Sequence, residues 1–216
     1  MTARRTAALM VAAAVFLNLA FTGLGMVFDY PDVLKHPSAD VLAAFRASQG
    51  VVSAWFLLLA LGAALLAPVA IGVGRLSTHR AMRLAVPVGV VAAAVQVVGL
   101  LRWPLLVPGW AAENNVDAFA TANQVLGNLV GETFGYLLTA AWTGLVLAAL
   151  GTRFAGRLFV ALGGVAAVLI FLGVFSPLQL PVVDFANFVG YVLWSVWLLI
   201  FAAVLVRRGA RQPSRP

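Results

Sequence analysis

The chain has 216 residues, of which 63% are hydrophobic and only 10% are charged, and its mean hydropathy is +1.02. A soluble domain of this size needs a larger charged fraction to cover its surface, so the composition excludes one and is typical of a polytopic membrane protein. The net charge of +7 does not indicate nucleic-acid binding, because all basic residues except Lys35, Arg46 and Arg102 lie at the termini or in alternate short connections. Cytoplasmic loops carry such an excess of basic residues, so the sequence predicts that both termini are cytoplasmic.

Six apolar stretches long enough to cross a bilayer follow one another, and they predict an all-α fold with six transmembrane helices. We expect these helices at about 7–28, 51–73, 84–107, 123–150, 158–175 and 185–206. Residues 1–206 then form one transmembrane domain in the cell (inner) membrane. Residues 207–216 are expected to form a basic, disordered cytoplasmic tail.

The connections between these helices differ in character on the two sides of the membrane. On the outer side, residues 29–48 contain a stretch, 40–46, that predicts a short amphipathic helix lying on the membrane interface. Residues 108–122 are expected to form an outer loop. On the inner side, residues 74–83 form a basic loop, and Arg153 and Arg157 bracket a short turn.

The fourth predicted helix carries most of the polar residues found within an apolar stretch. At about 100° per residue, Gln124, Asn128, Glu132, Thr139 and Thr143 lie on one face of an α-helix. A ridge of small residues lies beside this face, and such a ridge lets another helix approach closely in a membrane: Gly127, Gly131 and Gly135.

Counting residues from the cytoplasmic ends places Arg102 and Glu132 at the same depth, near the outer edge of the hydrocarbon core. A charge at that depth is tolerated mainly when it is paired, so the sequence predicts an Arg102–Glu132 ion pair. One interpretation is a structural lock between two helices. The other is an outward-facing polar pocket floored by this pair, with Gln124, Asn128 and either Asp29 or Asp184 near its mouth.

Several other candidate residues have a structural interpretation beside the functional one. Asp184 precedes the sixth helix, where an N-cap is the commoner role of aspartate. Trp103, Trp110, Tyr30 and Tyr136 fit an outer aromatic belt, although Tyr30, Trp103 and Tyr136 are also candidate ligand contacts. Three deeper residues are expected to serve helix packing, Asn18 and Gln96 through bonds between helices and Trp194 through core contacts.

The chain contains no cysteine, which excludes thiolate catalysis and cysteine-ligated clusters. Its two histidines, His36 and His79, are expected on opposite sides of the membrane, so no metal site and no cofactor is expected. The chain lacks the motifs of zinc proteases, P-loop enzymes and serine hydrolases. Any catalysis would be acid–base work, with Glu132 as the acid, Asp184 or Asp29 as a second carboxylate and Arg102 tuning Glu132.

The first functional hypothesis is a site that binds an amphipathic, lipid-like or isoprenoid-like molecule and that can support acid-initiated isomerisation or cyclisation. The alternatives are a small proton-linked transporter or immunity-type exporter, and a non-catalytic subunit that packs on a partner through the glycine ridge. The expected partners are the lipid bilayer, an amphipathic small molecule or another helix, and not nucleic acid.

Three stretches of the chain resemble a family of bacterial integral membrane proteins. They are 28–34 with 40–42 and Phe45, then 99–108, and then Gly127, Gly131-Glu132, 135–139 and Trp142-Thr143. In this combination they are similar to the domain of unknown function 4386 family, over nearly the whole chain. The resemblance implies a six-helix inner-membrane protein and supplies no established activity.

Overall fold

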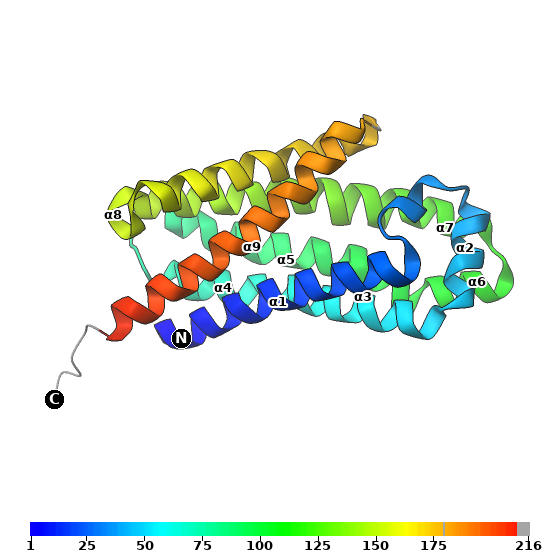
Figure 1. Ribbon diagram of the computed structural model, residues 1–216, viewed down its shortest axis with the longest axis horizontal. Coiled ribbons are helices and arrows are strands. Elements are labelled where there is room, and N and C mark those ends of the chain that lie inside the picture. The colour runs from blue at the N-terminus through cyan, green and yellow to red at the C-terminus, as the bar shows by residue number, and fades with distance from the viewer. Residues whose placement is uncertain (179, 211–216) are drawn as a thin grey trace.

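Long apolar helices lie side by side along the molecule in the computed structural model, which describes residues 1–178 and 180–210 (Figure 1). No strand occurs in this part of the chain. The long helical elements are α1 (Ala3–Phe28), α3 (Gln49–Ala64), α4 (Leu66–Gly74), α5 (Arg80–Leu105), η2 (Asn123–Phe134), α8 (Gly135–Leu172) and α9 (Pro181–Ala210). The shorter elements are η1 (Asp32–Lys35), α2 (Ser38–Ala47), α6 (Val107–Glu113), α7 (Val116–Ala122) and η3 (Gly173–Leu178). The expected all-α class is confirmed.

Five helical runs of the described chain are long and apolar enough to cross a membrane. One of them, Val116–Leu178, has 63 residues and contains a break. Within the break the backbone is non-helical at Gly151, Ala155 and Gly156, and both glycines have positive φ (59° and 85°). Side chains other than glycine rarely adopt such backbone angles. The break divides α8 into two limbs that lie side by side, and it confirms the turn expected between Arg153 and Arg157 (Figure 1).

The second apolar stretch is interrupted at one residue and forms two consecutive helices. α3 ends and α4 begins around Leu65, three residues before Pro68. Proline cannot donate a backbone hydrogen bond and its ring crowds the preceding turn, so a helix commonly bends just before it. The two helices together still form one apolar run, Gln49–Gly74.

One end of the bundle, which we call the capped end, is covered by η1, α2, α6 and α7 (Figure 1). The amphipathic helix expected near 40–46 forms as α2, but Val41, Leu42 and Phe45 bury their side chains in the protein rather than in a membrane interface. The prediction of a loop over 108–122 is wrong, because this segment folds largely as α6 and α7. Both corrections have one cause, since burial of apolar side chains against the end of the bundle stabilises these short helices.

Trp103 is the centre of the core at the capped end. Its ring stacks on Phe56 at 4.7 Å between centroids, and it also contacts Phe28, Phe45 and Phe119. The side chain is fully buried. Trp103 is therefore a core residue and not part of a belt at the lipid surface; its role as a ligand contact stays a prediction.

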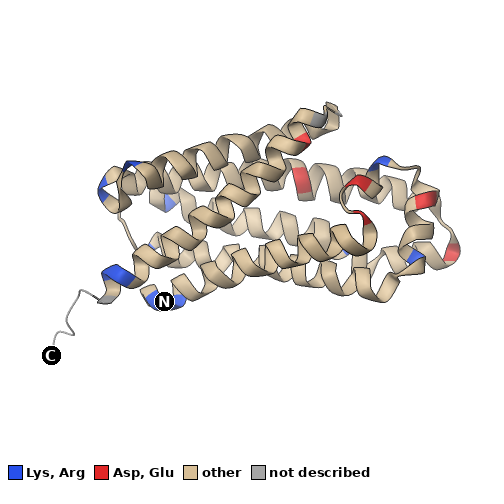
Figure 2. Cartoon of the chain, in the orientation of Figure 1, with Lys and Arg blue, Asp and Glu red and all other residues tan. Residues whose placement is uncertain are grey.

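The opposite end of the bundle is rich in arginine and has no acidic residue among those described (Figure 2). Met1 and the last turns of α9 both lie there, as do the loop before α5 and the break in α8. The expectation of a disordered tail from 207 is wrong for residues 207–210, which continue α9; Arg211 and Arg215 lie outside the described residues. Arg208 donates to the carbonyl oxygens of Arg153 and Phe154, and so it fastens α9 to the break.

Polar side chains join the helices at several points inside the bundle. Asn18 Nδ2 of α1 donates to Ser195 Oγ of α9 at 2.8 Å, and Gln96 Nε2 of α5 donates to Thr139 Oγ1 of α8 at 3.1 Å. These bonds confirm the expected roles of Asn18 and Gln96. Trp194 does more than pack, because its indole N–H donates to Thr143 Oγ1 at 2.9 Å.

Candidate functional site

The segment η2 is a π-helix of 12 residues that leads directly into α8. Most π-helical segments are single turns, and they occur frequently at functional sites, so a run of this length is unusual. Its hydrogen bonds span five residues instead of four, which makes the helix wider than an α-helix. Side-chain directions worked out from 100° per residue therefore shift progressively along 123–134.

The glycine ridge of this helix packs on α5. A Cβ added to Gly99 of α5 would lie 2.5 Å from Gly131 Cα, so the two backbones are in direct contact. A Cβ on Gly135 would lie 2.8 Å from the Gln96 side chain, and one on Gly127 would lie 2.6 Å from Arg102 Nη2. The close approach expected of these glycines is confirmed. The ridge is thus used in a contact within the chain, and the partner subunit considered from the sequence stays a prediction.

Arg102 is buried between α5 and η2, with 4% of its surface exposed. Its Nη1 donates to Gly99 O at 2.5 Å and its Nη2 donates to Asn123 Oδ1 at 2.8 Å. Its Nε has no hydrogen-bond partner among the described residues. The missing side chain of Gly127 gives the guanidinium the room it needs. Arg102 is thus held by neutral oxygen atoms.

The predicted Arg102–Glu132 ion pair does not form. The one salt bridge within the described residues joins Lys35 to Asp32 at 2.5 Å on the exposed η1. The contacts of the glycines show why. Gly99 lies level with Gly131 and Arg102 lies level with Gly127, which places Glu132 five residues, or about one π-helical turn, beyond the level of Arg102. Depth counting with α-helical geometry could not detect this register.

Glu132 is half-buried, and no described group lies within hydrogen-bonding or ion-pairing distance of its carboxylate. Tyr30, which follows α1 at the capped end, shows which charges lie near Glu132. Burial raises the pKa of the Tyr30 phenol, the Glu132 carboxylate raises it further, and the Arg102 guanidinium lowers it. Both charges therefore lie close enough to act on Tyr30, whose ring packs edge-on against Phe21 and Phe56.

Asp184 lies near the same end of the bundle. The hydrogen bond that Lys35 donates to Asp32 raises the pKa of Lys35, and the negative charges of Asp32 and Asp184 raise it further. Asp184 is half-buried in the first turn of α9, which begins at Pro181, so the expected N-cap role is wrong. Its carboxylate still lies where the N-terminal dipole of α9 favours a negative charge.

The remaining predicted site residues divide by exposure. Asp29 is exposed and ends α1 in a left-handed conformation (φ 50°). Gln124 is exposed and Asn128 is half-buried, and neither makes a side-chain hydrogen bond to a described residue. Tyr136 is half-buried, and its ring lies 5.9 Å from that of Tyr191 on α9. The structure thus gathers Glu132, Tyr30, Tyr136 and Arg102 near one another, with Gln124 at the surface.

Two residues of this region were missed from the sequence. Asn123 was not selected because it lies away from the polar face of the predicted helix; it lies four residues before Gly127, on the side of the glycine ridge, and there it accepts from Arg102. Tyr191 gave a usable signal, since it follows Asp184 by seven residues and Asn187 by four, which places all three on one face of α9. Asn187 is buried, and its Nδ2 donates to Ile170 O at 2.9 Å.

The structure has two concave features of note, and neither includes Glu132 or Arg102. One is a small cavity inside the bundle, lined by side chains that include Gln96, Thr139 and Tyr191. The other is an open apolar groove on α3, lined by Gly50, Val51, Ala54, Trp55 and Leu58. Within the described chain, no three side chains of the metal-binding types come together.

The five helical runs of membrane-spanning length in the described chain are consistent with a multi-pass membrane protein. The chain belongs to the family described as Domain of unknown function (DUF4386), whose model matches residues 6–202. The resemblance inferred from the sequence motifs is thereby confirmed. No curated protein and no solved structure matches the chain.

Proposed function

We propose that the protein crosses the cytoplasmic membrane six times with both termini in the cytoplasm, and that it binds an amphipathic, lipid-like or isoprenoid-like molecule at Glu132. The arginine-rich end of the bundle supports this orientation, since basic residues collect on the cytoplasmic side. The break in α8 supports six crossings, because it lets the two limbs of this helix cross in opposite directions.

The observation that carries the proposal is the state of Glu132. A carboxylate within a membrane span is costly, and such groups are usually paired or functional. Glu132 is half-buried in a span and has no partner among the described residues, while Arg102 is already held by Gly99 and Asn123. A ligand group that hydrogen-bonds to Glu132 would supply the missing partner. Its placement near the capped end favours entry from the outer leaflet.

The chemistry that fits this site is acid-initiated isomerisation or cyclisation. A protonated Glu132 would donate its proton to a carbon–carbon double bond, and a second carboxylate would remove a proton from the resulting cation, so that no co-reactant is consumed. Asp184 is the better second carboxylate, because it is half-buried whereas Asp29 is exposed. Tyr30 and Tyr136 would present aromatic faces to a developing cation, and Arg102 would act through its charge on Glu132.

A proton-linked transporter would also use Glu132, but it needs a further ionisable group deeper along the path. The inner halves of the predicted spans contain no Asp, Glu, His or Lys. We therefore rank this alternative below the binding site.

The test compares the wild-type protein with Glu132→Gln and with Glu113→Gln, which neutralises an exposed carboxylate on α6 at the same end. Each protein is purified in mild detergent, examined by native mass spectrometry for bound amphiphiles, and labelled with a photoreactive isoprenoid alcohol. We expect about a tenfold loss of labelling in Glu132→Gln, equivalent to ~1.4 kcal/mol of binding, and no loss in Glu113→Gln. A folded wild-type protein without bound amphiphile or labelling would contradict the proposal.

If Glu132→Gln fails to fold, its labelling has no folded reference, and Tyr136→Phe takes its place in the comparison. Folding is checked by helical circular dichroism and by elution as a single species. Equal labelling of Tyr136→Phe and the wild type would then leave the proposed site without support from either residue.

A further inference from the structure

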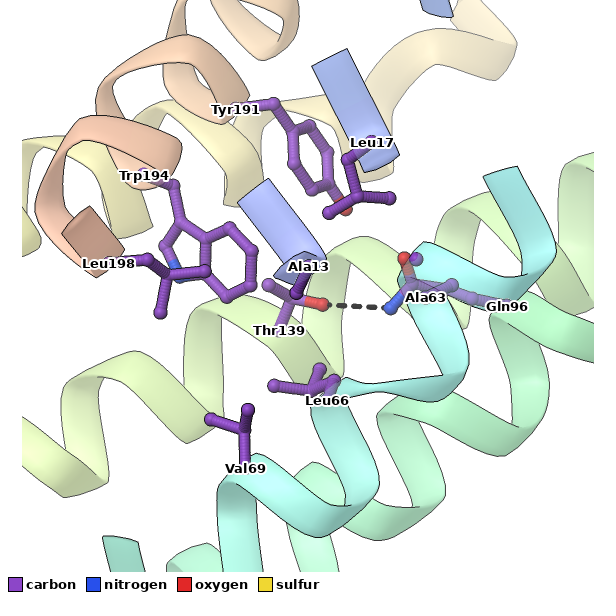
Figure 3. A pocket seen from close by; sticks show the side chains of 11 residues that line it. Ala13, Leu17, Ala63, Leu66, Val69, Gln96, Thr139, Tyr191, Trp194 and Leu198 are labelled. Atoms are coloured by element: carbon purple, nitrogen blue, oxygen red, sulfur yellow. Dashed lines mark hydrogen bonds between the residues drawn. The ribbon is translucent and has the colours of Figure 1, made fainter. Parts of the chain in front are cut away.

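A small cavity lies in the middle of the bundle, where α1, α3, α4, α5, α8 and α9 meet (Figure 3). Its volume is about 10 Å³, close to the minimum that a single water molecule requires. Most of its walls are apolar. Three hydrogen-bonding side chains line it from three different helices: Gln96 of α5, Thr139 of α8 and Tyr191 of α9.

The hydrogen bonds around the cavity leave one acceptor without a donor. Both protons of Gln96 Nε2 are used, one toward Ala92 O and one toward Thr139 Oγ1, each at 3.1 Å. The orientation of this amide is fixed, because Ala92 O can only accept and so requires the nitrogen to face it. The amide oxygen of Gln96 receives no hydrogen bond from any group in the described part of the chain.

The other polar groups stand beside this oxygen. The Thr139 hydroxyl accepts from Gln96 and keeps its own proton, and the Tyr191 phenol lies next to Thr139. Figure 3 shows the Tyr191 ring reaching from α9 toward the side of the cavity where the Gln96 amide lies. Trp194 also lines the cavity, but its N–H is already bonded to Thr143.

We propose that this cavity is a binding site for one ordered water molecule, which donates to Gln96 Oε1 and accepts from the hydroxyl of Tyr191. A buried water needs between about two and four polar partners, and the cavity supplies three. Inside the hydrocarbon layer no bulk water is available to satisfy these groups, so a retained water is their natural partner.

The water links α5, α8 and α9 at one point and positions Tyr191. The Tyr191 ring contacts Tyr136, which is four residues along the chain from Glu132. Thr139 lies seven residues from Glu132, or about 10 Å along a helix. The water therefore lies on the arginine-rich side of the candidate site and holds in place the helices that carry it. The inference does not depend on the ligand proposed for Glu132, because it rests on the cavity and its polar lining alone.

The test is a crystal structure of the whole chain grown in a lipidic mesophase and showing ordered water. We expect one isolated density peak within hydrogen-bonding distance of Gln96 Oε1, and its loss in Ala13→Val, which fills the cavity from α1. An empty wild-type cavity, or a phenol of Tyr191 bonded directly to Gln96 Oε1, would overturn the proposal.

A second measurement needs no crystals. Gln96→Leu and Tyr191→Phe form a double-mutant cycle of unfolding equilibria in detergent, repeated in the Ala13→Val background or, if that variant does not fold, in Ala63→Val, which fills the cavity from α3. A bridging water predicts about a threefold or larger coupling of the two unfolding constants, and the coupling disappears when the cavity is filled. Coupling that is absent in the native background, or unchanged in the filled one, would contradict a bridging water.

Discussion

Gly99 of α5 and Gly131 of η2 bring two helix backbones into direct contact, since a Cβ on Gly99 would lie 2.5 Å from Gly131 Cα. This contact fixes the register between the two helices. It places Gly127 opposite Arg102 and Gly135 opposite Gln96, so the positions of the buried arginine and of Glu132 both follow from it.

The first prediction concerns this contact. Gly99→Ala and Gly131→Ala would force the two backbones apart, and overpacking of this kind costs ~1–3 kcal/mol of unfolding free energy. Gly144→Ala on α8 is the matched control, because nothing lies within 4 Å of its added Cβ. Unfolding in detergent measures all three variants. If they are equally stable, the backbone contact between Gly99 and Gly131 is not real.

The second prediction concerns the support of Arg102. Asn123→Ala removes the oxygen that accepts from Arg102 Nη2, and a lost hydrogen bond to a charged group costs ~1.5–3 kcal/mol. Gln124→Ala, at the next and exposed position, should change the unfolding free energy by less than ~0.5 kcal/mol. The reverse order of the two effects would contradict the bond between Asn123 and Arg102.

The third prediction concerns the break in α8. Gly156 has φ 85° and ψ 179°, a conformation essentially confined to glycine, so Gly156→Ala should cost ~1–3 kcal/mol. Gly164→Ala has equally open space around its Cβ and no such backbone strain, and it should be close to neutral. Accessibility labelling of cysteines introduced in the two limbs would show whether the limbs still run in opposite directions on either side of the break.

The fourth prediction concerns the bond between Asn18 and Ser195. A double-mutant cycle of Asn18→Ala and Ser195→Ala should give a coupling of ~0.6 kcal/mol, the average measured for hydrogen bonds between transmembrane helices, and at most ~1.7 kcal/mol. A cycle of Asn18→Ala with Gln96→Ala, whose side chains share no hydrogen bond, serves as the control. Equal coupling in both cycles would mean that the Asn18–Ser195 bond contributes nothing specific.

The fifth prediction concerns alkaline pH. Burial, followed by the charge of Glu132, raises the pKa of Tyr30 above its usual value of 10.0, so the folded protein holds the phenol proton more tightly than the unfolded chain does. The contribution of Tyr30 to stability is therefore complete below pH ~10 and declines as the pH rises toward the folded-state pKa.

Thermal unfolding followed between neutral and alkaline pH checks this prediction. The wild-type midpoint should fall more steeply above pH ~10 than that of Tyr30→Phe. Parallel curves for the two proteins would show that Tyr30 titrates with an ordinary pKa.

The amino-acid sequence by itself determined where the long helices lie, which end carries the arginines, that the glycines form a packing ridge, and that Asn18 and Gln96 bond to other helices. These features depend on local properties, namely hydropathy, charge and the size of single side chains, which can be read without knowing what each residue contacts.

Only the tertiary structure decided the neighbours of Arg102 and Glu132. The contact of Gly99 with Gly131 set a register in which Asn123 accepts from Arg102 and Glu132 lies about one turn away. The same holds for Trp103, which the capping helices α2 and α7 bury by packing Phe45 and Phe119 against it. Register and capping depend on contacts between distant segments, and no local pattern in the chain specifies them.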